Sequence, residues 1–151
     1  MRGRILWVDE DERIWATERN LLTGLGFVVV PIPDATNALS VISLGGMDDV
    51  SLVIMDVMLL EGDDEKTFSE QVTDAGMNTG LILAEMICAM KADYGKRILF
   101  FSRATKLNHI AKIKAITSKI GARYLQKTAD TQGKFFVSWL KNQGIIEEPP
   151  P

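Results

Sequence analysis

The chain is poor in the residue types that form disulfides and zinc sites. Its 151 residues include one cysteine, Cys88, and one histidine, His109. A single thiol cannot form an internal disulfide or supply a multi-thiolate zinc site. Because there is no second histidine, a catalytic or metal site built on histidine is not expected. We therefore expect a protein of a reducing compartment, with His109 as an exposed helix residue.

Long apolar runs and clustered positive charge are also missing. The longest apolar stretch, residues 81–90, is interrupted by Glu85 and falls short of the roughly 20 residues that span a bilayer. The run Ile5–Val8 is too short for the core of a signal peptide. The net charge is −3, and the 17 Lys and Arg residues form no stripe. These absences predict a cytoplasmic protein with no membrane role and no direct contact with nucleic acid.

The order of apolar patterns predicts an α/β fold. Hydrophobic residues make up 46% of the chain, which suits one domain with a sizeable core. Helical patterns alternate with short β-rich runs, as in a parallel sheet covered on both faces. A first helix is expected after Asp11, and a second strand at 27–32. Pro31 within that strand indicates a sheet edge, and Asp34 is a good N-cap for the next helix.

Two further helices follow later in the chain. One carries an isoleucine stripe and ends before Gly121, and the other covers residues from about 130 to 142. The stripe consists of Ile110, Ile113, Ile116 and Ile120. The domain is expected to cover 1–142, and residues 143–151, which end in three prolines, are expected to be a flexible tail or the stub of a linker.

Four apolar runs end on or just before polar residues that can carry out chemistry. In a parallel sheet the carboxyl ends of the strands meet at one edge, where ligands bind. Acids, a hydroxyl and an ammonium should therefore meet there. In chain order the residues are Asp9, Glu10, Asp11, Asp56, Ser102 and Lys127.

Acids gathered in one pocket restrict the possible chemistry. Asp9 and Glu10 beside Asp56 would raise one another's proton affinity unless a hard cation such as Mg²⁺ neutralised them. The Asp56 carboxylate could then attack phosphorus as a nucleophile, while Lys127 and Ser102 bind the oxygens of the transferring group. The product would be an aspartyl phosphate.

The same runs resemble the response regulator receiver domains of two-component signalling. The segment Ile5–Asp11 is similar to the first strand and acidic pair of that family, and Leu52–Asp56 to its third strand and phosphoacceptor. The segment Ile98–Ala104 resembles the fourth strand with its Ser/Thr switch, and Tyr124–Lys127 the fifth with its aromatic switch and lysine. The resemblance extends from about residue 3 to about residue 142.

The resemblance implies a fold and a set of roles. The fold is a flavodoxin-like, doubly wound α/β structure with a five-stranded parallel sheet of order 2-1-3-4-5. The phosphoacceptor is Asp56, assisted by Lys127 and Ser102, and the switch pair is Ser102 and Tyr124. The implied Mg²⁺ ligands are Asp9, Glu10, Asp56 and the backbone carbonyl of Met58.

The resemblance also implies partners. A sensor histidine kinase or a phosphotransfer protein would donate the phosphoryl group. The chain itself would be no enzyme beyond its own phosphorylation and dephosphorylation. The surface around the fourth helix, fifth strand and last helix would change on phosphorylation and could form a homodimer.

Two features depart from the family. Receiver domains cross from the third strand to the third helix in a few residues, whereas residues 57–79 form a long acidic stretch here. This stretch is a partner surface, a lid over Asp56 or, as the commoner case for a charge run, a solvated loop. Asp63 or Asp64 could cap a short helix within it, on which Phe68 and Val72 share a face. The second departure is Thr128, which replaces the proline that commonly follows the lysine; its peptide bond should be trans.

Two other functions compete with a phosphorylation switch. A haloacid-dehalogenase-like phosphatase also uses an aspartate at a strand end, but it needs a second Asp two residues later, where this chain has Met58. The nearer rival is a receiver-like interaction module that works without phosphorylation. The presence of Asp56 with its expected partner residues favours the switch. The long insertion and Thr128 are the reasons why the interaction module stays an alternative.

Overall fold

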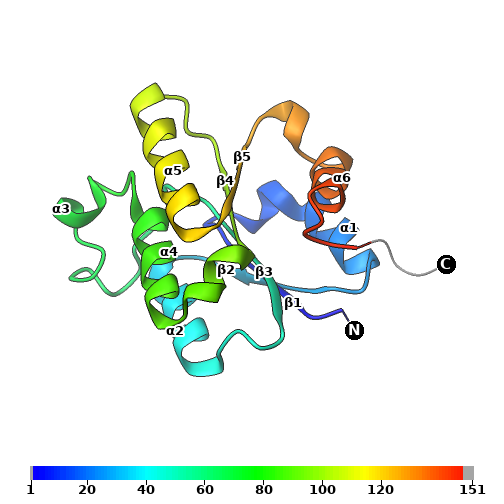
Figure 1. Cartoon of the computed structure of the whole chain (residues 1–151), viewed down its shortest axis with the longest axis horizontal. Helices are drawn as coiled ribbons and strands as arrows, with labels where there is room; N and C mark the ends of the chain where they lie inside the picture. Colours follow the sequence, from blue (N-terminus) through cyan, green and yellow to red (C-terminus); the bar gives the residue numbers. More distant parts are fainter. Residues whose placement is uncertain (1, 148–151) are drawn as a thin grey trace.

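The computed structural model describes residues 2–147 and contains one doubly wound α/β domain (Figure 1). Its five strands form a single sheet of order β2-β1-β3-β4-β5, and every pair is parallel. The order predicted from the sequence is therefore confirmed, with β2 and its Pro31 at an edge. The strands are β1 (Arg4–Val8), β2 (Val28–Ile32), β3 (Val50–Met55), β4 (Ile98–Ser102) and β5 (Arg123–Gln126).

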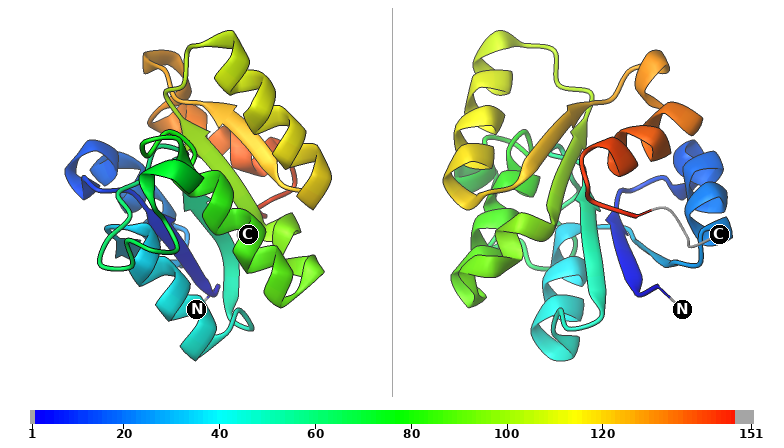
Figure 2. Two further views of the ribbon diagram at one scale, coloured as in Figure 1. Left: turned by 90° about the vertical axis from the view of Figure 1, so that its left-hand side faces the viewer. Right: turned by 45° about the vertical axis from the view of Figure 1, so that its right-hand side comes forward.

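Helices cover both faces of the sheet. Helices α1 and α6 pack together on one face, and α2, α4 and α5 form the layer on the other (Figures 1 and 2). The α-helices are α1 (Ala16–Gly24), α2 (Ala35–Gly45), α3 (Glu70–Thr73), α4 (Thr79–Met90), α5 (Leu107–Ile120) and α6 (Lys134–Asn142). Three 3₁₀ helices accompany them: η1 (Glu12–Trp15), η2 (Ala92–Arg97) and η3 (Ala129–Thr131).

The sheet separates two hydrophobic cores. Alternate strand residues face opposite sides, so Leu6 and Val53 join the core under α2, α4 and α5, whereas Trp7 joins the core under α1 and α6. In the second core the rings of Trp7 and Trp15 stack, with centroids 4.3 Å apart. Both tryptophans are packing residues of this core, and together the two cores hold the strand ends in fixed positions.

Local signals explain where several helices begin and end. The Asp34 carboxylate accepts a hydrogen bond from the Asn37 amide at 2.8 Å and caps α2, as predicted. Gly121 ends α5 with a φ of 76°, a left-handed conformation that a residue with a Cβ adopts at a cost. The isoleucine stripe of α5 packs on the first core through Ile113, which is fully buried.

The expected exposure of His109 was wrong, and the structure adds detail to the first helix and to the expected tail. The first helix is divided into η1 and α1, because Asp11 caps η1 and the buried Trp15 lies at the junction. His109 is only 8% exposed; it lies in the first turn of α5 and lines a cleft that residues of the insertion also line. Ile146, in the segment expected to be a tail, is 4% exposed and packs in the second core; the domain boundary at 142 stays a prediction. The last part of the expected tail, residues 148–151, lies outside the described residues.

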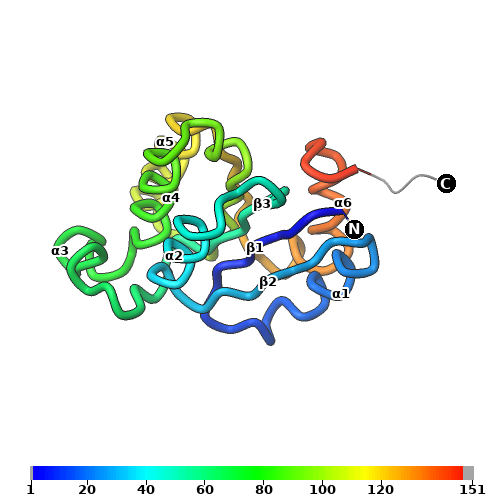
Figure 3. The backbone as a smooth tube through the Cα atoms, turned by 90° about the horizontal axis from the view of Figure 1, so that it is seen from below, coloured from blue at the N-terminus to red at the C-terminus, as the bar shows by residue number. Residues whose placement is uncertain are grey.

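The insertion at 57–79 is a packed segment rather than a solvated loop. Phe68 is 2% exposed and belongs to the first core, whereas Val72 is half exposed. The two residues therefore do not share a face. Ser69 caps the short helix α3, whereas Asp64 caps the preceding turn, where its carboxylate accepts from the Thr67 amide at 3.1 Å. Seen from below, α3 extends outward beyond α2 and α4 (Figure 3).

Hydrogen bonds anchor the insertion at its base. The amides of Ala35 and Thr36 at the start of α2 donate to the carbonyls of Leu60 and Glu61 at 2.9 and 3.0 Å. The Gly80 amide donates to the Val57 carbonyl at 2.8 Å, which brings the two ends of the insertion together. The insertion therefore does not displace the end of β3. Within residues 2–147, none of the helices has the length and hydrophobicity needed to cross a membrane.

Candidate functional site

The carboxyl edge of the sheet brings together the polar residues that follow β1, β3, β4 and β5. The register pairs Val8 with Met55, so the residues that come next, Asp9 and Asp56, lie on adjacent strands. The Asp56 amide donates to the Val8 carbonyl at 3.2 Å. On the other side, β4 and β5 pair Ser102 with Gln126. Lys127 follows directly.

A buried ion pair joins the first and last strands of this edge. Lys127 Nζ lies 3.0 Å from Asp9 Oδ2, and the two side chains are 5% and 7% exposed. The ammonium also lies 5.1 Å from the centroid of the Phe101 ring, where it makes a cation–π contact. The Lys127 amide donates to the Ser102 carbonyl at 2.7 Å, which fixes the lysine backbone on β4. Lys127 therefore points into the site although Thr128 follows it in place of a proline. The peptide bond between Lys127 and Thr128 is trans, as expected.

The surroundings of Asp56 shift the pKa of its carboxyl in opposite directions. Burial raises the pKa of its carboxyl above the ordinary value, and the nearby Asp9 carboxylate raises it further. The Lys127 ammonium, the Ser102 hydroxyl and the Met58 amide, 3.2 Å from Asp56 Oδ1, act in the opposite direction. Burial is the largest of these effects, so the pKa of Asp56 is raised overall. The ionised Asp56 carboxylate is therefore poorly solvated, and the Lys127 ammonium is the main group that compensates its charge.

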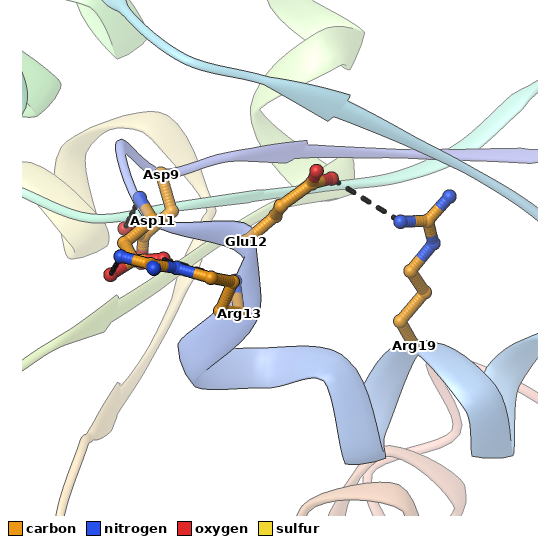
Figure 4. Close-up of polar contacts among 5 residues, drawn as sticks. All are labelled: Asp9, Asp11, Glu12, Arg13 and Arg19. Atoms are coloured by element: carbon orange, nitrogen blue, oxygen red, sulfur yellow. Dashed lines mark hydrogen bonds and ion pairs between the residues drawn. The ribbon is translucent and has the colours of Figure 1, made fainter.

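The acidic residues that follow β1 make different contacts. The Asp9 carboxylate accepts from the Asp11 amide at 3.2 Å and turns to the sheet edge. Asp11 instead caps η1 and pairs with Arg13 at 3.0 Å, and that guanidinium lowers the pKa of the Asp11 carboxyl. Glu12 reaches Arg19 at 3.2 Å (Figure 4). Only Asp9 of this run is therefore buried beside Asp56.

Glu10 remains at the surface. It is exposed, and with Asp9 it lines a hollow of about 270 Å³ between the ends of β1 and β2. Among residues 2–147 no three His, Cys, Asp or Glu side chains gather closely enough to form a ready metal site. Mg²⁺, however, commonly binds through one or two carboxylates and keeps several waters. Two partly desolvated carboxylates, Asp9 and Asp56, are compatible with that binding mode.

Two buried hydroxyls, one on β4 and one on β5, have no hydrogen-bond partner in the described part of the chain. Ser102 Oγ is fully buried and lies near Asp56, but the two side chains do not meet at hydrogen-bond geometry. Tyr124 Oη is also buried and unpaired, and burial raises its pKa. An unmade hydrogen bond of this kind costs about 1–3 kcal/mol. Both groups can therefore gain a bond if an oxygen-rich group arrives or the side chains move.

The sequence reasoning missed two contributors to the site. Phe101 lies beneath the Lys127 ammonium, and only its place in the β4 run could have suggested that role. Gly80 packs directly on the Asp56 backbone, because a Cβ at this position would lie 2.2 Å from the Asp56 carbonyl oxygen. The insertion reaches the acidic edge through Leu60, which lines a surface hollow with Glu10.

Comparisons with known proteins show which solved structures share this fold. No family model matches the sequence, and no curated protein matches it. A response regulator receiver domain protein from Methanospirillum hungatei JF-1 is 18% identical, with 95% of this chain and 94% of that chain covered and a TM-score of 0.66. A signal receiver domain of an HD domain-containing protein from Pseudomonas fluorescens Pf-5 is 22% identical over 95% and 94%, with a TM-score of 0.64.

A third similar structure carries a ligand. The response regulator TrrA from Thermotoga maritima, in complex with Mg²⁺-BeF, is 18% identical over 95% of this chain and 99% of that chain, with a TM-score of 0.61. Many structural neighbours are thus receiver domains of response regulators, and this chain has their flavodoxin-like fold.

Proposed function

We propose that the protein is a phosphorylation-dependent signalling switch with Asp56 as its phosphoacceptor. The observation that carries this proposal is the pairing of a buried lysine with the acids of the strand edge. Lys127 lies 3.0 Å from Asp9 and acts electrostatically on Asp56. A nucleophilic carboxylate next to a buried ammonium and an unpaired hydroxyl is the donor set that acyl phosphate formation needs.

The proposed reaction transfers one phosphoryl group from a phosphohistidine of a sensor kinase or phosphotransfer protein. An Asp56 carboxylate oxygen forms a bond to phosphorus, while the bond between phosphorus and the histidine nitrogen breaks. That nitrogen keeps the electron pair and takes a proton from solvent. Lys127 moves from Asp9 toward the transferred oxygens and neutralises them, and Ser102 Oγ donates its unused hydrogen bond to one of them.

The residues that would hold Mg²⁺ are Asp9 and Asp56, with the Met58 carbonyl, and Glu10 lies at the rim of the adjoining hollow. When bound, the cation neutralises the oxygens of the transferring group. Asp9 is also the partner of Lys127, whose Nζ lies 3.0 Å from Asp9 Oδ2.

Phosphorylation would be read out through neighbouring side chains. Ser102 would follow the new oxygens, and Tyr124, whose hydroxyl has no partner, would repack beside β4. The surface formed by α5, β5 and α6 would change as a result, which shifts the population between two states. This surface is also where we propose that a homodimer could form.

The test is direct phosphorylation with a small donor. The full chain is incubated with acetyl phosphate and MgCl₂, and intact mass is measured beside Asp56→Asn. We expect the wild type to gain one phosphoryl group and Asp56→Asn to gain none, with loss of the gain when the metal is chelated. Asp11→Asn is the matched control, because Asp11 lies in the same acid run but pairs with Arg13; it should be phosphorylated like the wild type.

The rival proposal is an interaction module that works without phosphorylation. The observation that favours it is the exposure of Glu10, which leaves Asp9 and Asp56 without a third acid gathered beside them in residues 2–147. If folded wild-type protein gains no phosphoryl group under any donor and metal concentration, the module replaces the switch. Phosphorylation of Asp56→Asn at the wild-type level would move the acceptor elsewhere.

A further inference from the structure

A second polar cleft lies between the end of the insertion and the first turns of α5. Its volume is about 810 Å³, within the range of sites that hold small molecules. It shares no residue with the strand-edge site. The residues that matter for its chemistry are Asp74, Asn78, Lys106, Leu107, His109 and Lys112.

One wall of this cleft is the positive end of a long helix. Helix α5 has 14 residues, its N-cap Lys106 makes no side-chain capping bond, and its first turn has no acid. The amides at the start of such a helix lack partners and attract anions. Lys106 and Lys112 add two positive charges, and neither makes an ion pair with another residue in the range 2–147.

Two buried polar side chains point independently to a ligand. His109 is 8% exposed and its Nε2 has no hydrogen-bond partner in the described chain; Asn78 is 4% exposed and its Oδ1 is likewise unpaired. They come from opposite walls, His109 from α5 and Asn78 from the insertion. Unpaired buried polar atoms are rare in native proteins, because each costs about 1–3 kcal/mol.

The remaining lining limits what the ligand can be. Leu107 is 82% exposed and Met77 lines the same cleft, so an apolar surface adjoins the cationic end. Asp74 lines the cleft on the insertion side, where its negative charge would repel an anion that extended across the whole cleft. The favourable position for negative charge is therefore local, at the start of α5. We propose that this cleft binds a small molecule that carries a phosphate group at the α5 amides and an apolar or aromatic body along Leu107 and Met77.

The proposal is independent of phosphoryl transfer to Asp56. The probes are inorganic phosphate, for the anion site alone, and adenosine monophosphate, for the anion with an aromatic body. Backbone amide NMR of the full chain is followed during each titration. We expect saturable shifts at the amides of residues 107–109, tighter binding of adenosine monophosphate than of phosphate, and weaker binding of both as salt rises.

Shifts without saturation, or saturable shifts confined to residues around Asp9 and Asp56, would overturn the proposal. The second outcome would identify the strand edge as the only phosphate site, which separates this test from that of the proposed function. Equal affinity for the two probes would overturn the part of the proposal that concerns the apolar body.

Charge variants make the test specific. Lys112→Glu should weaken binding about tenfold or more, the effect of losing one charge-assisted hydrogen bond. Lys114→Glu is the matched control, because it makes the same charge change at an exposed position of α5 that does not line the cleft; it should change affinity less than about twofold. Equal weakening by both variants would reduce the binding to general attraction by a basic helix. Circular dichroism checks that each variant is folded.

Discussion

Lys127 Nζ and Asp9 Oδ2 lie 3.0 Å apart across the carboxyl edge of the sheet, with both side chains almost fully buried. The contact joins residues 118 positions apart in the sequence. It connects β5 to β1 across the site that contains Asp56. Stability and proposed activity therefore depend on the same pair, and the two effects can be separated by mutation.

Removing one partner of this pair should be strongly destabilising. Lys127→Met leaves the Asp9 carboxylate buried and uncompensated, which costs about 3–5 kcal/mol of the free energy of unfolding. The double variant Asp9→Asn, Lys127→Met removes the charge of Asp9 but still leaves ionised Asp56 without the Lys127 ammonium, so it should recover only part of that loss. Urea denaturation of the wild type, both single variants and the double variant completes the cycle. A Lys127→Met loss below about 1 kcal/mol would mean that the pair is solvated in solution.

Asp56→Asn should stabilise the protein at neutral pH. Burial raises the pKa of Asp56 in the folded state. A raised carboxyl pKa contributes stability that is present below the unfolded-state pKa and is lost as pH rises through the folded-state pKa. At pH 7 the wild type therefore carries the cost of a poorly solvated charge, and the variant does not. We expect the variant's Tm to be higher by roughly 2–4 °C, the change produced by about 1 kcal/mol in a domain of this size.

The pH dependence checks the cause of that stabilisation. As pH falls below the folded-state pKa of Asp56, the wild-type carboxyl becomes neutral and the difference in Tm should shrink. A difference that is constant from neutral to acidic pH would show that the stabilisation has another origin. The same series can be followed by differential scanning calorimetry.

The sequence was sufficient for the fold because its signals are local. Apolar runs that end in Asp9, Asp56 and Ser102 identify the strands, and Pro31 places β2 at the edge. Caps such as Asp34 depend on residues three positions apart, which is within reach of a sequence pattern. The residues that converge at the sheet edge follow from the parallel topology alone.

The details of the site depend on contacts that no local pattern encodes. Lys127 and Asp9 form an ion pair because β5 and β1, which are distant in the sequence, bring them together. Phe101, on β4, makes a cation–π contact with the same ammonium. The buried His109 lines a cleft whose other side is formed by the insertion, more than 30 positions earlier in the sequence. An acidic composition favoured a solvated loop for the insertion, whereas one buried aromatic, Phe68, and the hydrogen bonds to α2 hold it in place.

The packing of the insertion can be tested with two of its apolar residues. Phe68 is 2% exposed, so Phe68→Ala should cost about 3–5 kcal/mol. Val72→Ala, in the same insertion but 51% exposed, should change stability by less than about 0.5 kcal/mol. Both are measured by urea denaturation at fixed pH. Similar small effects at both positions would mean that the insertion is detached from the core in solution.

Gly80 gives a separate way to disturb the acceptor without touching its side chain. A Cβ at this position would lie 2.2 Å from the Asp56 carbonyl oxygen and 2.8 Å from Val57 Cα, so Gly80→Ala must displace the backbone that carries the acceptor. We expect a loss of about 1–3 kcal/mol in stability and slower phosphorylation by acetyl phosphate in the protein that remains folded. Gly24→Ala is the control, since a Cβ at that position in α1 has no neighbour within 4 Å; it should be neutral or slightly stabilising. If Gly80→Ala matches the control in both stability and phosphorylation rate, the close approach of α4 to Asp56 does not set the position of the acceptor.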